Sequence, residues 1–146
     1  MEKFKFELKM FFKKKELENN NYLTKICALL IHAAKIDENY TEIEENLIKK
    51  TLIELGLEKD KTSKIINDAI KIEENSNQIL DFTREVKNLP EKDKIKIIEA
   101  LWSIIYSNKD ADIYETNLMR RLAGLLYIDT KTMGDIKDRI KNQNFR

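Results

Sequence analysis

The sequence predicts an all-α fold: a single-domain bundle of seven to eight helices built from two pseudo-symmetric helical repeats. Three observations predict it. A chain of 146 residues, with 42% hydrophobic and 36% charged residues, has the size and composition of one globular domain. Only three Gly and one Pro occur, too few for the turns of a hairpin-rich sheet protein. Apolar residues also recur at helical spacing from end to end.

The first segment is a basic aromatic helix, and we divide the chain into this helix at 1–18 and an all-helical domain at 19–146. Residues 1–15 hold six Lys and two Glu, a net side-chain charge of 6 − 2 = +4. Four of its apolar residues share one helical face: Phe4, Leu8, Phe11 and Phe12. Two interpretations stay open. The segment docks onto the bundle as its first helix, which the extra apolar residues Phe6 and Met10 favour, or it binds an anionic membrane surface.

Helices follow near 22–37, 42–56 and 61–74. Apolar residues at i, i+3 and i+4 predict the buried face of the first: Ile26, Leu29, Leu30, Ala33 and Ile36. The same spacing predicts the face of the second: Ile43, Leu47, Leu52 and Leu55. Gly56 then takes the C′ position, where a left-handed residue ends a helix. A linking helical segment around Phe82 is closed by Pro90, which starts the next helix.

The second half repeats the plan with a shift of 71 residues, which predicts helices near 91–108, 112–126 and 131–142. The stretch 46–50, Asn-Leu-Ile-Lys-Lys, meets 117–121, Asn-Leu-Met-Arg-Arg, class by class. Neither half can bury a full core alone, so we expect them to pack face to face about a pseudo-two-fold axis. The expected interior residues are Leu30, Leu47, Leu101, Trp102 and Leu122.

An acidic turn opens the second helix of each half, in KIDENYTEIEE at 35–45 and YSNKDADIYET at 106–116. Clustered carboxylates suit hard cations, which take several oxygen ligands, but neither turn fits the calcium-loop spacing. Thr41 to Glu44 also reads as a capping box, and Asp112 to Glu115 as its counterpart. Two interpretations stay open: structural capping, and binding of a divalent cation or a partner.

The remaining chemistry points away from catalysis. Cys27 and His32, the only residues of their kinds, lie five positions apart and so on different parts of one helix, which argues against a Cys-His dyad. We expect a buried, inert thiol and a partly buried structural histidine. With Lys plus Arg at 27 and Asp plus Glu at 26, no overall charge favours nucleic acid. The lack of a signal peptide or membrane-spanning run predicts a cytoplasmic location.

The chain resembles the TerB-like family, named for bacterial tellurite-resistance proteins, over about residues 22–142. The family's Ala-Asp-Gly type turn followed by a helix-opening Glu is matched by Ala34-Lys35-Ile36-Asp37-Glu38 leading to Glu44. The second copy is Tyr106-Ser107-Asn108-Lys109 leading to Glu115. The turn glycine is replaced in both copies, and the second aspartate is Asn108. The resemblance implies an all-helical stress-response or protein-interaction module without established catalysis. If the family's acidic residues bind metal, the ligands retained here are Asp37, Glu44 and Glu115.

These observations give two functional hypotheses. The first is a non-enzymatic TerB-like module of the cytosol that binds a protein partner, with a divalent-cation dependence carried by its acidic turns. The alternative is a peripheral membrane protein brought to anionic lipid by residues 1–15.

Overall fold

The computed structural model describes residues 2–36, 40–75, 79–107 and 113–144, with the backbone alone at residues 2, 11–20, 113–115 and 144. All regular structure in these ranges is helical, which confirms the predicted fold class. The elements are α1 (Glu2–Ala34), α2 (Glu42–Glu54), the short 3₁₀ helix η1 (Lys59–Lys61), α3 (Thr62–Glu74), α4 (Leu80–Lys87), α5 (Glu91–Tyr106), α6 (Ile113–Leu125) and α7 (Thr130–Asn144). Their bounds follow the predicted ranges closely from α2 onward.

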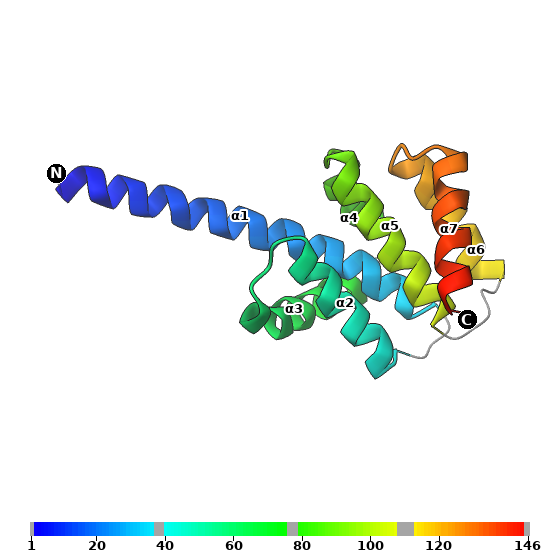
Figure 1. Cartoon of the computed structure of the whole chain (residues 1–146). Coiled ribbons are helices and arrows are strands. Elements are labelled where there is room, and N and C mark those ends of the chain that lie inside the picture. Colours follow the sequence, from blue (N-terminus) through cyan, green and yellow to red (C-terminus); the bar gives the residue numbers. More distant parts are fainter. Residues whose placement is uncertain (1, 37–39, 76–78, 108–112, 145–146) are drawn as a thin grey trace.

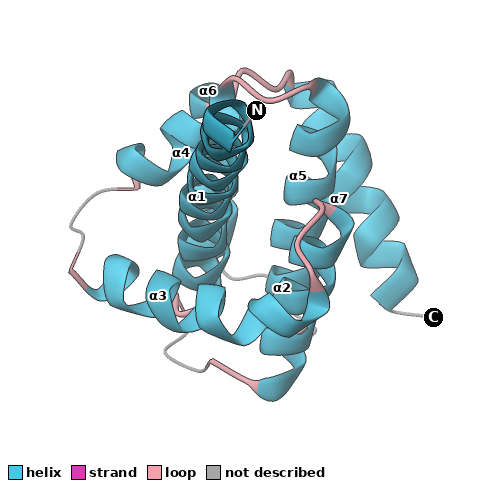
Figure 2. Ribbon diagram, turned by 90° about the vertical axis from the view of Figure 1, so that its left-hand side faces the viewer, coloured by secondary structure: helices cyan, strands magenta, loops and turns pink. Residues whose placement is uncertain are grey.

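The C-terminal half of α1 is the central rod of the bundle. It packs against α2, α3, α4 and α5, while α5 in turn packs against α7 and α4 against α6 (Figures 1 and 2). Residues 26–31 are fully buried on every side. A helix that is apolar all round needs neighbours all round, and the bundle supplies them here.

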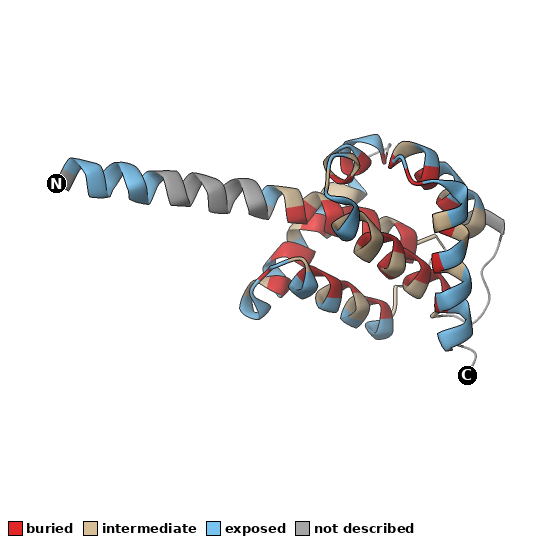
Figure 3. Cartoon of the chain, turned by 45° about the horizontal axis from the view of Figure 1, so that its top comes forward, coloured by how far each residue is buried: buried red, intermediate tan, exposed pale blue. Residues whose placement is uncertain are grey.

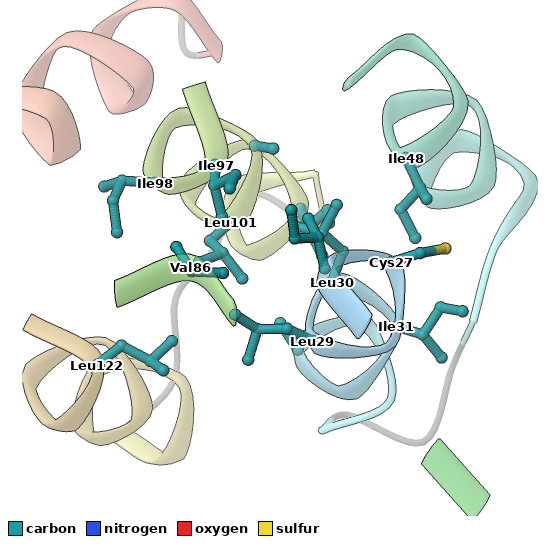
Figure 4. Packing of buried hydrophobic residues seen from close by; sticks show 14 of the residues in the cluster. Cys27, Leu29, Leu30, Ile31, Ile48, Val86, Ile97, Ile98, Leu101 and Leu122 are labelled. Atoms are coloured by element: carbon teal, nitrogen blue, oxygen red, sulfur yellow. The ribbon is translucent and has the colours of Figure 1, made fainter. Parts of the chain in front are cut away.

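One continuous core joins the two halves of the chain. Figure 4 shows Leu29, Leu30 and Ile31 of α1 lying among side chains of four other helices. Of the predicted interior residues, four are buried: Leu30, Leu101, Trp102 and Leu122. This confirms most of the expected interior, whereas the pseudo-two-fold arrangement of the halves stays a prediction.

The predicted buried face of α2 is confirmed at Leu52 and is wrong at Ile43. Leu47 is only partly buried and Ile43 is exposed, because the helix turns Glu44, Ile48, Thr51 and Leu52 inward. Two of these four are polar, so a search for apolar spacing alone places the face wrongly. Both have local partners: Glu44 bonds to the helix cap, and the Thr51 hydroxyl donates to the Leu47 carbonyl at 2.9 Å.

Two helices end with the same backbone motif, 71 residues apart. After α2, the Gly56 amide donates to the Ile53 carbonyl and the Leu57 amide to the Leu52 carbonyl, both at 3.0 Å. This is a Schellman motif, and Gly56 at φ 109° confirms the predicted left-handed C′ residue. The same pattern follows α6, where Tyr127 has φ 57°. The Tyr127 amide donates to the Gly124 carbonyl, and the Ile128 amide donates to the Ala123 carbonyl. The second half therefore uses a tyrosine where the first uses glycine.

Helix α1 passes through the expected boundary at residue 18 without a break. Neither Gly nor Pro occurs before Gly56, so nothing in the sequence stops the helix between its two halves. Its 33 residues span about 50 Å at 1.5 Å per residue. The favoured docking of the first segment onto the bundle is wrong, because the straight helix carries residues 3–10 away from the core and leaves them exposed (Figures 1 and 3).

Candidate functional site

The first acidic turn is a complete helix cap. Thr41 is the N-cap of α2 with extended backbone, and its hydroxyl oxygen accepts from the Glu44 amide at 3.2 Å. In return, Oε1 of Glu44 accepts from the Thr41 amide at 3.1 Å and from the Thr41 hydroxyl at 3.0 Å. Only 1% of Glu44 is exposed. The predicted capping box is confirmed, and this carboxylate is held by the start of its own helix.

The three predicted metal ligands are not brought together by what the structure describes. Asp37 lies outside the described residues, as does Asp112 of the second predicted cap, and the side chain of Glu115 is not described. Within the described ranges, no group of three or more His, Cys, Asp or Glu side chains could hold a metal ion. Glu44 is therefore assigned to capping, and cation binding at Asp37 and Glu115 stays a prediction.

Two buried groups lie near this cap, the Tyr40 hydroxyl and the Cys27 thiol. Burial, followed by the charge of Glu45, raises the pKa of the Tyr40 hydroxyl above its usual range. That hydroxyl is buried and has no hydrogen-bond partner among the described residues. Burial likewise raises the pKa of the Cys27 thiol, which faces the α1–α2 contact (Figure 4). A thiol that stays protonated and inaccessible is a poor nucleophile, as the sequence predicted.

His32 belongs to a small polar cluster between α1 and α3. Its Nδ1 lies 3.3 Å from Oε1 of Glu73, and Nζ of Lys35 lies 3.2 Å from Oε2 of the same carboxylate. The histidine is partly buried, as predicted. Its partner lies 41 positions away in the sequence, so no local pattern could have identified the pair.

Residues 3–10, which we call the α1 arm, form the most exposed apolar segment of the described chain. The exposed fractions of its four large apolar residues are 68% for Phe4, 64% for Phe6, 43% for Leu8 and 51% for Met10. Scattered surface hydrophobics are ordinary, but four exposed large apolar residues within seven positions of one helix are typical of an interaction site. None of the described helices is long and apolar enough to cross a membrane.

The α1 arm also contains three lysines and one glutamate, namely Lys3, Lys5, Lys9 and Glu7. Its apolar residues are therefore interleaved with net positive charge. This combination suits a surface that is apolar at its centre and acidic at its rim, or an anionic lipid surface.

The family model described as tellurite resistance protein TerB matches the chain over residues 23–138. Comparisons with curated proteins and with solved structures found no match. The family match begins at Leu23, where α1 enters the core, and leaves the α1 arm outside it. Together with the all-helical bundle, a match over most of the chain shows that this chain belongs to the TerB family.

Proposed function

We propose that this TerB-family chain is a non-catalytic protein-interaction module of the cytoplasm, and that the α1 arm is its docking element. The observation that carries the proposal is the exposure of Phe4, Phe6, Leu8 and Met10 on a helix that projects from the bundle (Figure 3). The burial of Cys27 and the engagement of His32 with Glu73 support a role without catalysis.

The apolar residues of the arm lie on two opposed faces. Phe4 and Leu8 are four residues apart and form one ridge, as do Phe6 and Met10. Because each residue turns the helix by about 100°, the two ridges are roughly 200° apart. A flat membrane covers one side of a helix, whereas a groove between partner helices covers two. The geometry favours a protein partner.

The buried half of α1 supports the same conclusion. Residues 26–31 are apolar all round, and four helices enclose them. Residues 3–10 also carry apolar residues on opposed sides, but the described chain covers neither side. We infer that the partner presents an apolar groove between helices, bordered by acidic residues that face Lys3, Lys5 and Lys9.

The experiment is affinity capture from the native cells, read by quantitative mass spectrometry, with three forms of the full chain. One form is unchanged, one carries Phe4→Ser and Phe6→Ser, and a matched control carries Ile43→Ser and Ile53→Ser, which are exposed apolar residues of α2. We expect a partner that the arm variant loses and the control keeps. A partner set shared equally by all three forms contradicts the proposal.

The membrane alternative has its own support in the lysines among the exposed aromatics of the arm. Co-sedimentation with vesicles of phosphatidylserine and phosphatidylcholine separates the two. Binding that the arm variant loses and the α2 control keeps would move the function to the membrane surface. If the protein does not sediment with the vesicles, the proposal that the arm binds a protein partner is retained.

A divalent-cation dependence of partner binding is part of the proposal. Its support is the family membership and the carboxylates of the two acidic turns, of which Glu44 is already engaged in the α2 cap. Repeating the capture with EDTA and with added Ca²⁺ or Mg²⁺ tests it. A partner retained equally in all three buffers removes the cation from the mechanism.

A further inference from the structure

A groove between α5, α6 and α7 has the lining of a small-molecule site, and it is separate from the α1 arm. Its volume is about 190 Å³. Its apolar lining residues are Trp102, Met119, Ala123 and Met133, and its polar ones are Thr116, Arg120, Thr130 and Lys137. Among the described lining residues none carries a carboxylate. An apolar pocket with a few polar groups is the usual form of a ligand site.

Trp102 forms part of the apolar lining of this groove. The residue is only 2% exposed, and its indole Nε1 is buried with no partner among the described residues. Buried indole N–H groups usually find an acceptor, because a buried donor without a hydrogen bond is unfavourable. The Tyr106 ring stacks on Trp102 with centroids 5.8 Å apart and so helps to fix its orientation.

The two cations at the groove have no carboxylate partner in the part of the chain that the structure describes. Lys137 Nζ lies 5.6 Å from the centroid of the Trp102 ring, and neither it nor Arg120 forms a salt bridge with a described residue. By contrast, Arg139, on the same helix as Lys137, is paired with Glu99 at 2.6 Å. Two cations that have no carboxylate partner among the described residues make a site for negative charge.

We propose that this groove binds a small organic carboxylate carried on one aromatic ring or a short apolar chain. An apolar cavity of about 150 Å³ accommodates benzene, so the groove has room for one ring and its carboxylate. The ring lies against the two methionines and Trp102, while the carboxylate accepts from Arg120 and Lys137. For a ligand of this size we expect a Kd of about 1 mM.

The single Trp of the chain makes the test direct, since the ¹H–¹⁵N spectrum contains one indole cross-peak. Phenylacetate is titrated into the full-length protein, with phenylacetamide as its uncharged analogue. Because Trp102 lines the groove, we expect a saturable shift of the indole cross-peak with phenylacetate, and binding of the amide weaker by about tenfold. Absence of a saturable shift, or equal affinity for the two compounds, would overturn the proposal.

Substitutions locate the binding within the groove. Arg120→Gln and Lys137→Gln remove the two cations, and each should weaken phenylacetate binding by about tenfold. Arg121→Gln and Lys141→Gln are controls, because these cations lie on the same two helices, are exposed and do not line the groove. Circular dichroism checks that all four variants fold. Equal loss in the controls would show nonspecific attraction and contradict the site.

Discussion

Replacing Gly56 by alanine isolates the conformational contribution of the α2 cap. The residue has φ 109°, and a Cβ built onto it meets nothing within 4 Å, so the substitution introduces strain without a clash. Holding an L-residue in a left-handed conformation costs roughly 1–2 kcal/mol. Alanine also restricts the unfolded chain, which returns roughly 0.5 kcal/mol. We therefore expect the free energy of unfolding to fall by about 1 kcal/mol.

Urea unfolding followed by circular dichroism measures this change, and a thermal scan should show a drop of about 4 °C. Gly134→Ala is the matched control. This glycine lies within α7, has no positive φ and also has open space at the Cβ position, so alanine should stabilise the helix by about 0.5–1 kcal/mol. The same substitution should therefore have opposite effects on stability at the two positions. Equal effects, or no loss at Gly56, would refute it.

Three further predictions concern the cap, the thiol and the acidic turns. Thr41→Ala removes the N-cap of α2 and should lower the free energy of unfolding by about 1 kcal/mol in the same urea assay. An unchanged unfolding midpoint would contradict a stabilising role for this cap. Cys27 should not react with Ellman's reagent at pH 8 in the folded protein, because the thiol is buried and burial raises its pKa above the usual range. It should react once urea unfolds the protein. Rapid reaction without urea would contradict the burial of this thiol. Calorimetric titration of Ca²⁺ and Mg²⁺ should give saturable heat that a folded Asp37→Asn, Glu115→Gln variant lacks, and identical heats for both proteins would remove these residues as ligands.

Much of this fold can be predicted from the sequence because its signals are local. Apolar spacing, the rarity of Gly and Pro, and caps such as Thr41 and Gly56 act within one or two turns of a helix. They fix where helices begin and end. They do not fix the rotation of α2, since a buried Glu44 and Thr51 take places that a hydrophobicity pattern assigns to apolar residues.

The candidate sites were harder to predict because they depend on long-range placement. The composition of residues 3–10 is the same whether the segment docks or projects, and its exposure follows from the unbroken course of α1. The groove at Trp102 depends on α5, α6 and α7 meeting, and nothing around Trp102 in the sequence indicates that its N–H lacks a partner. Pairs such as His32 with Glu73 are likewise set by packing alone.

Site-specific photo-crosslinking in the native cells tests the central claim most directly. A photoreactive phenylalanine is placed at Phe4 or Phe6, which lie on opposed faces of the arm, and at Ile43 of α2 as an exposed control. Both arm positions should crosslink to the same protein partner and position 43 should not, because a helix groove covers both faces of the arm. Crosslinks to lipid alone, or protein adducts of equal yield at all three positions, would contradict it.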